Sequence, residues 1–285
     1  MNKVVIDKKI CSTYDGYYTL LEYLSDSKFI CKSYEEVKFD FSENREFDIN
    51  LFAIIVAIAY ETKKNGYDFT ITKVKNANLK RKWQEYNRFD NLTVLENNIP
   101  FKEFAPDLHL DFDQYINEYV YKYVSKMMSD RLGSNIKSNL GEIFGNVETH
   151  TESEKVFCCG QINDEKLDFT IVNLGITIRE TVDNYTERNN IKNISNPIPW
   201  AVAEGNTTKI STGGFGLHLL KEFISKNNGK FQIISGDDYY EWTGEEKNDV
   251  FNHFFPGTIV NVEFNLTDKS KYRLKNEDFN INDLF

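Results

Sequence analysis

The feature that most constrains the fold is a helical stripe with a polar edge in residues 135–152, NIKSNLGEIFGNVETHTE. Glu142, Asn146 and His150 recur every four residues along that edge. A helix with this pattern must lie against another layer, and it then presents a carboxylate, an amide and an imidazole along one rim. The apolar residues of the stripe recur at the 3.6-residue spacing of an amphipathic helix: Ile136, Leu140, Ile143, Phe144 and Val147.

The segments that follow this helix are typical of β-strands, so the partner layer is expected to be a sheet. The stretch DFDQYINEYVYKYVSKMMSD, residues 111–130, predicts one further helix before it. A helical layer placed against such a sheet is an α+β two-layer sandwich. The expected strands are KVFCCGQI (155–162), KLDFTIVNLG (166–175), KFQIISG (230–236) and GTIVNVEF (257–264).

The first hundred residues show a different order, in which strands and helices alternate. Asp48 is placed to cap the first of these helices, and Gly66 to terminate it. The order strand, helix, strand, helix predicts a small α/β unit over residues 37–41, 51–60, 67–72 and 76–89.

Charge and composition narrow the classes of partner. The chain has 34 basic and 44 acidic side chains, and its formal net charge of -10 repels nucleic-acid phosphates and anionic lipid. We therefore expect no nucleic-acid partner. The basic run KVKNANLKRKW, residues 73–83, is interpreted as a solvated helix face, with a local basic patch as the alternative.

Cysteine spacing and hydropathy favour a cytoplasmic protein without a membrane partner. The four cysteines form no C-x-x-C pair, and the first sixteen residues lack the shape of a signal peptide. The longest apolar run, Leu51 to Tyr60, is half the length that a membrane-spanning helix needs. We expect it to be a buried helix.

Two further motifs carry candidate site residues. The strand DFTIVNLGITI runs into Asn173 and Gly175, where a glycine permits a sharp turn and close approach of a planar ligand. The stretch STGGFGLHLLKEFISKNNG, residues 211–229, puts glycines directly before a helix. The N–H groups in the first turn of a helix have no partner within the helix, and the helix dipole adds partial positive charge there. The N-terminus of this helix is therefore suited to bind phosphate. Neither the dinucleotide fingerprint nor the Walker spacing is met.

The order and spacing of these motifs resemble the Bergerat ATP-binding fold of the gyrase B, heat-shock chaperone, histidine kinase and MutL (GHKL) superfamily. The resemblance covers roughly residues 112–266 and implies an ATPase-like domain over residues 112–268, with helices on one face of a mixed sheet. ATP and Mg2+ are the cofactors that it implies.

The resemblance assigns roles to the helix residues. Asn146 is the implied magnesium ligand, which agrees with the preference of Mg2+ for oxygen ligands. Glu142 falls where hydrolysing members keep their general base, and a carboxylate there can orient an attacking water. His150 either contacts the phosphates or packs.

The strand end matches the adenine box of the family in part. The family's motif is Asp-x-Gly-x-Gly, and here it reads Asn173, Leu174, Gly175, Ile176, Thr177. The amide of Asn173 can accept from adenine or donate to guanine, and we favour adenine. Thr177 replaces the second glycine.

The resemblance also implies an ATP lid over residues 179–212, of the type found in sensor kinases and anti-sigma-factor serine kinases. Lys209, Thr207 and Thr208 are candidates to close over the γ-phosphate, with a solvated loop lysine as the alternative for Lys209. The implied phosphate-binding turn comprises Thr212, Gly213, Gly214, Phe215, Gly216 and Leu217.

Residues 30–95 resemble the STAS-like domains of anti-sigma-factor antagonists in element order. Those domains carry a phosphorylatable serine at the start of a helix, where this chain has Asp48, Ile49 and Asn50. The expected organisation is therefore a STAS-like domain over 1–100, a connector over 101–111, the ATPase-like domain and a polar tail over 269–285.

Together these features predict a cytoplasmic Mg-ATP-binding regulatory protein, acting as an ATPase or as an anti-sigma-type serine/threonine kinase. A self-phosphorylating histidine kinase is disfavoured because no histidine lies in a helix pair resembling a phosphoacceptor domain. The implied partner is an unidentified regulatory protein or protein substrate, and the resemblance allows a homodimer. The alternative is a non-catalytic nucleotide sensor or interaction module with a degenerate pocket.

Overall fold

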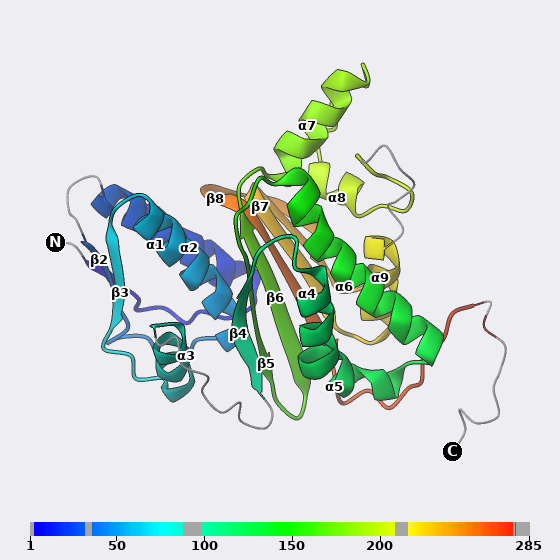
Figure 1. Ribbon diagram of the computed structural model, residues 1–285, viewed down its shortest axis with the longest axis horizontal. Coiled ribbons are helices and arrows are strands. Elements are labelled where there is room, and N and C mark those ends of the chain that lie inside the picture. The colour runs from blue at the N-terminus through cyan, green and yellow to red at the C-terminus, as the bar shows by residue number, and fades with distance from the viewer. Residues whose placement is uncertain (1–2, 32–35, 88–97, 209–215, 276, 278–285) are drawn as a thin grey trace.

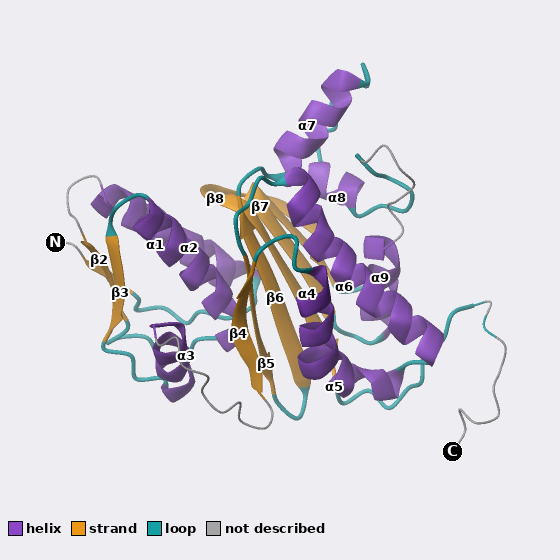
Figure 2. Cartoon of the chain, in the orientation of Figure 1, coloured by secondary structure: helices purple, strands orange, loops and turns teal. Residues whose placement is uncertain are grey.

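The computed structural model describes residues 3–31, 36–87, 98–208, 216–275 and 277. It contains two sheets, and helices lie between them and beyond the larger one (Figure 1). The expected combination of helices and sheets in layers is confirmed at this level. From one side to the other, the layers are a three-stranded sheet, two helices, a five-stranded sheet and a second helical layer (Figure 2).

The smaller sheet is parallel, with strand order β1-β2-β3. Its buried residues, such as Phe39 and Phe69, face α1 and α2 and form one hydrophobic cluster with them. The N-terminal elements are β1 (Lys3–Val5), α1 (Tyr14–Cys31), β2 (Glu36–Asp40), a 3-10 turn η1 (Ile49–Leu51), α2 (Phe52–Lys64), β3 (Asp68–Thr72) and α3 (Ala77–Asn87).

The predicted alternation of strands and helices in this region is confirmed, but one of the two predicted helix caps is wrong. Gly66 follows the end of α2 with φ +84°, a conformation that favours glycine, as expected. Asp48 precedes η1 without capping it. Its Oδ2 accepts from the N–H of Ser12 at 2.8 Å, so the carboxylate joins two loops instead.

The larger sheet is antiparallel throughout, with order β4-β5-β6-β8-β7, so the expectation of a mixed sheet is wrong. The predicted connector is also wrong in part. Residues 98–104 form an edge strand, which crosses the expected domain boundary at residue 100. The five strands are β4 (Asn98–Phe104), β5 (Val156–Ile162), β6 (Lys166–Leu174), β7 (Lys230–Trp242) and β8 (Glu246–Asn265).

Helices α4, α6 and α9 cover one face of this sheet (Figure 1). The segment predicted as one helix over 111–130 is a helical run interrupted by a π-helical turn, and it ends at Met127. Ser129 then caps α6, because its hydroxyl accepts from the N–H of Leu132 at 3.2 Å. The run comprises α4 (His109–Ile116), η2 (Asn117–Tyr121), α5 (Lys122–Val124) and η3 (Ser125–Met127), and it precedes α6 (Asp130–His150).

The opposite face of the five-stranded sheet is covered by α1 and α2. Side chains alternate along β6, so that Phe169 packs toward α6 and Val172 packs toward the N-terminal helices. Tyr17 of α1 and Phe52 of α2 are fully buried in the same cluster as Val172. Helices therefore lie on both faces of the sheet, whereas the sequence predicted them on one.

The centre of this contact is polar. The Nδ2 atom of Asn50 lies 2.9 Å from the hydroxyls of Ser12 and Thr170 and 3.0 Å from Oδ1 of Asn261. Asn50 has no solvent exposure. Because the N–H groups of this one amide reach both an N-terminal loop and the sheet, the network helps to fix how the N-terminal elements sit on the sheet.

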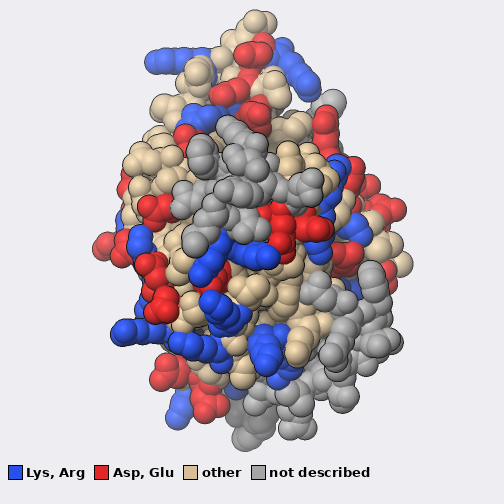
Figure 3. Space-filling model, turned by 90° about the vertical axis from the view of Figure 1, so that its left-hand side faces the viewer, with Lys and Arg blue, Asp and Glu red and all other residues tan. Residues whose placement is uncertain are grey.

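The surface beyond the smaller sheet mixes both signs of charge. Lysine and arginine side chains on that face are interspersed with aspartate and glutamate (Figure 3). Within the described ranges, no helix combines the length and apolar character needed to cross a bilayer. At the C-terminal side, Tyr272 pairs with Met128 through an isolated parallel bridge, which ties part of the expected polar tail to the start of α6.

Candidate functional site

A cavity opens where α6, the end of β6 and the start of α9 meet. Helices α7 (Ile178–Arg188) and α8 (Pro197–Ala201) close one side, and β6, β7 and β8 form its floor. Figure 1 shows α7 and α8 above the end of the sheet, beside α6 and α9 (Gly216–Lys226). The lining residues are Glu142, Ile143, Asn146, Val147, Thr151, Ile171, Asn173, Ile178, Thr181, Val182, Trp200, Ala201, Asn206, Thr207, Thr208, Leu217, Ile233, Thr258 and Val260.

The polar edge predicted on the long helix faces this cavity. Glu142 and Asn146, one turn apart on α6, both line it and are both half-buried. Ile143 and Val147, on the adjoining stripe, are buried and line the same wall. The apolar stripe thus holds the helix on the sheet while the carboxylate and the amide stay accessible.

Asn173 forms part of the floor and is 5% exposed. Its Nδ2 donates to the carbonyl of Leu174 at 3.4 Å. Because a carbonyl oxygen only accepts, this contact orients the amide so that Oδ1 remains available as an acceptor. An acceptor at this point can take a hydrogen bond from an amino group on a bound ring, and the second N–H of the amide can still donate.

Thr258 is a site residue that the sequence reasoning missed. It is the direct cross-strand neighbour of Asn173 in the β6–β8 pair, and both line the cavity. Its hydroxyl lies 2.8 Å from the hydroxyl of Ser235. The alternation in GTIVNVEF puts Thr258 on the same face of the strand as Val260, and this pattern could have identified Thr258 as a site residue from the sequence.

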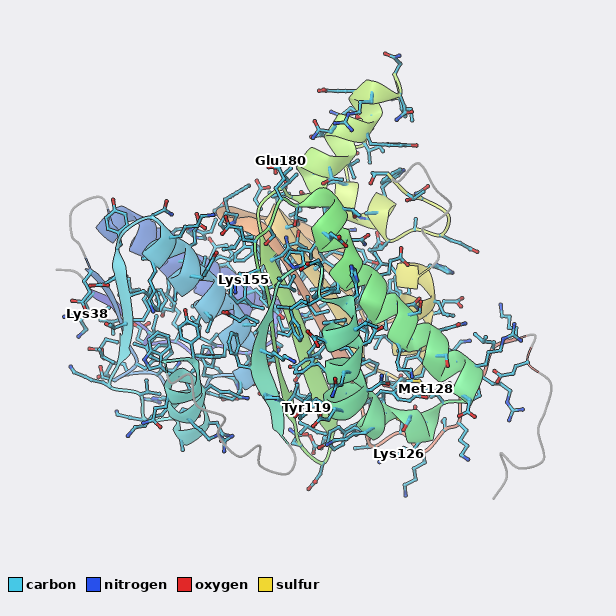
Figure 4. The ribbon with its side chains drawn as sticks, in the orientation of Figure 1. Lys38, Tyr119, Lys126, Met128, Lys155 and Glu180 are labelled. Carbon is cyan, nitrogen blue, oxygen red and sulfur yellow. The ribbon has the colours of Figure 1, made fainter. Side chains whose placement is uncertain are left out.

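Gly175 and Thr177 lie just beyond the cavity, where each has a structural partner. Gly175 has φ +116°, and a Cβ there would come within 1.9 Å of the carbonyl oxygen of Thr151 at the end of α6. Thr177 caps α7 in a capping box with Glu180, whose place at the base of α7 is seen in Figure 4. These two residues shape the turn that joins the cavity floor to its side wall.

The predicted lid is more regular than expected. Its first ten residues belong to α7, and a second short helix, α8, follows. Thr207 and Thr208 line the cavity, as does Leu217 in the first turn of α9, which begins at Gly216. Lys209, Thr212, Gly213, Gly214 and Phe215 lie outside the described residues. The same is true of the His150 side chain, although its backbone ends α6.

Among the described residues that line the cavity, Glu142 is the only acidic or basic side chain. The remaining walls combine apolar side chains with amides and hydroxyls. Such a surface suits a flat heteroaromatic ring with polar edges.

A separate group of potential metal ligands lies in the N-terminal loops. The nearest ligand atoms of Cys11, Glu46 and Asp48 are within 4.8 Å of one another. Burial and the two carboxylates raise the pKa of the Cys11 thiol to about 12, and Lys9 lies 2.7 Å from Glu46. This group shares no residue with the cavity that holds Asn146.

No known protein-family model matches the chain, and no curated protein matches it in sequence.

Proposed function

We propose that the chain is a GHKL-type protein that binds Mg-ATP in the cavity beside α6 and hydrolyses it or transfers its γ-phosphate to a partner protein. One observation supports this most directly. Glu142, Asn146, Asn173 and Leu217, which the resemblance selected from three distant motifs, all line one cavity. Polar borders of unrelated amphipathic helices would not be expected to converge in this way.

The cavity residues suit distinct parts of the nucleotide. Asn173 Oδ1 would accept from the adenine amino group, with Thr258 beside it. The amide oxygen of Asn146 would hold Mg2+, which on binding neutralises phosphate charge and orients the phosphates. Glu142, one turn earlier, would take a proton from an attacking water or from an acceptor hydroxyl.

The N-terminal unit suits a regulatory role in which it acts as part of the same folded structure as the nucleotide-binding cavity. In the STAS-like resemblance, the phosphorylated position falls at Asp48, Ile49 and Asn50. Here Ile49 is 7% exposed and Asn50 is fully buried against the sheet. A phosphoacceptor is therefore expected on a separate protein and not at this position.

A second candidate function is that of a nucleotide sensor that does not hydrolyse ATP. The residues at the end of β6 favour it. Asn173 replaces the family's aspartate, and the Thr177 hydroxyl is engaged in a helix cap. Such a protein would bind Mg-ATP and change its lid without releasing phosphate.

Calorimetric titration with Mg-ATP and Mg-GTP, together with a phosphate-release assay, tests the proposal. A ligand at one hundred times its Kd stabilises the fold by about 2.7 kcal/mol, so binding should also raise the Tm. We expect Asn146→Ala to weaken Mg-ATP binding and to abolish its dependence on magnesium. Failure of the wild-type protein to bind either nucleotide would refute the proposed function.

Glu142→Gln separates an enzyme from a sensor. We expect this variant to bind Mg-ATP but to lose phosphate release by about 100-fold or more, because it lacks the base. Glu148→Gln is the matched control, since Glu148 lies on the exposed side of the same helix and pairs with His109 at 2.7 Å. Equal turnover in Glu142→Gln and wild type would exclude Glu142 as the base, and binding without turnover in wild type would support the sensor.

A further inference from the structure

We infer that Trp200 is the platform on which the adenine ring stacks, and that it contributes to the specificity of the cavity for a nucleotide. This inference rests on the proposed function. Neither the nucleotide-binding motifs nor the resemblance selected Trp200. It lies in α8, within the segment expected to be an irregular lid, and it is one of the residues that line the cavity.

The indole is held in place by contacts that do not involve a nucleotide. Its ring centroid lies 5.6 Å from that of Tyr185 in α7, with 37° between the ring planes. The backbone N–H of Trp200 donates to the backbone carbonyl of Asn196 at 3.2 Å, and Nδ2 of Asn206 donates to the backbone carbonyl of Trp200 at 3.0 Å. The tryptophan is thus fixed by its backbone and braced through its ring.

The local sequence also limits the freedom of this platform. Pro197 and Pro199 fix two φ angles in the five-residue helix PIPWA, and Pro197 occupies its first turn. Ile198 and Val202, on either side of Trp200, are each 1% exposed and belong to the hydrophobic cluster that contains the apolar stripe of α6. An aromatic ring on a rigid support loses little conformational entropy when a ligand stacks on it.

The other lining residues match a flat ring. Ile143 and Val147 of α6 and Ile178 of α7 line the cavity with Trp200, and Asn173 provides the acceptor at the floor. A planar heteroaromatic ring needs this combination of apolar faces and one polar edge. Trp200 itself is half-buried and lines the same cavity.

The test compares ligands with and without a base. Calorimetric titrations of the full chain with Mg-ATP, adenosine and magnesium tripolyphosphate are run on wild type, Trp200→Ala and Trp200→Phe. Stacking on an aromatic side chain favours the binding of a base, because every base has a flat π-face. We therefore expect Trp200→Ala to raise the Kd of Mg-ATP and adenosine by at least about fivefold.

Trp200→Phe keeps an aromatic face and should restore affinity to within about threefold of wild type. Tripolyphosphate affinity should be unchanged in both variants. Equal ATP and adenosine affinities in Trp200→Ala and wild type would overturn the inference. An equal loss of tripolyphosphate affinity in Trp200→Ala would also overturn the inference, because Trp200 would then hold the lid in place and not contact the base. Failure of the proposed function is distinct: the wild-type protein itself would bind no nucleotide.

Fluorescence gives an independent readout. The chain has three tryptophans, and Trp83→Phe with Trp242→Phe leaves only Trp200 as a reporter. We expect adenosine to quench this emission, whereas tripolyphosphate should not. Trp242→Ala is the matched control for loss of an indole, because Trp242 lies on β7 outside the cavity with Lys221 over its ring at 4.2 Å. Its adenosine affinity should equal that of wild type.

Discussion

Arg179 and Asp238 form a two-point ion pair that ties the side wall of the cavity to the sheet. The Nη2–Oδ1 distance is 2.5 Å and the Nε–Oδ2 distance is 3.0 Å. The hydrogen bonds to Asp238 raise the pKa of the Arg179 guanidinium further above its already high value. Arg179 is the second residue of α7, and Ile178 and Val182 of that helix line the cavity. The position of this wall therefore depends on a contact outside the cavity.

Arg179→Ala should loosen α7 and weaken nucleotide binding. The Asp238 side chain is 11% exposed, so losing the partner leaves a largely buried carboxylate, and we expect a loss of about 1–3 kcal/mol in unfolding free energy. Mg-ATP affinity should fall several-fold because the wall becomes mobile. Urea unfolding and calorimetry measure both effects. Arg188→Ala, at the exposed end of α7, should change neither.

The periodic elements were predictable because their signals are local. The strands over 155–162 and 166–175 and the helix over 135–152 have clear period-2 or 3.6 patterns, and the structure contains them with small shifts in boundary. The same patterns indicate which side of each element is buried. Periodicity therefore predicts that Glu142 and Asn146 lie on one edge of a helix. Their grouping with Asn173 around one site rests on the family resemblance and not on periodicity.

The remaining features depend on distant or non-periodic partners. Strand β4 contains Pro100 and forms only by pairing with β5, more than fifty residues later. Helix α7 begins at a capping box whose Thr177 was assigned to the ligand because it occupies a glycine position of the family motif. Packing of α1 and α2 on the sheet depends on contacts such as Asn50 with Asn261, which no local pattern encodes.

Asn50→Ala should destabilise the chain without separating its two halves. Removing the amide leaves the buried groups of Ser12, Thr170 and Asn261 with fewer partners, and we expect a loss of about 2–4 kcal/mol. Both halves share one hydrophobic cluster, so unfolding should remain a single transition. Urea titrations followed by far-UV circular dichroism and by tryptophan fluorescence should give coincident curves. Two separate midpoints in wild type would contradict the shared core.

Gly175→Ala should be among the most damaging single substitutions at the site. The added Cβ meets the carbonyl of Thr151 at 1.9 Å in a left-handed backbone, so α6 must move from the strand end. We expect a loss of about 3 kcal/mol or more. Gly66→Ala is the control, because Gly66 also has a positive φ but nothing within 4 Å, and it should lose only about 1–2 kcal/mol. Thermal unfolding compares the two, and equal shifts would show that backbone strain alone is responsible.

Asp168 should make stability depend on pH. Burial and the nearby Glu263 raise the pKa of Asp168 to about 6 from its ordinary 3.8, despite Lys166 at 3.0 Å and a hydrogen bond from Gln161. Between these two values the unfolded chain releases the proton while the folded chain retains it. The unfolding free energy contributed by this group is therefore fully present below about pH 4, falls toward pH 6, and is lost above it.

Asp168→Asn isolates this contribution, because the amide keeps the shape of the neutral acid and does not titrate. The unfolding free energy of wild type minus that of the variant should decrease as pH rises from about 4 to 6 and then level off. Urea unfolding at several pH values measures this difference. A difference that increases with pH over this range would mean that Lys166 stabilises the ionised carboxylate more than burial and Glu263 oppose it. Asp168 would then be the ionised half of an ion pair with Lys166 and not a protonated acid.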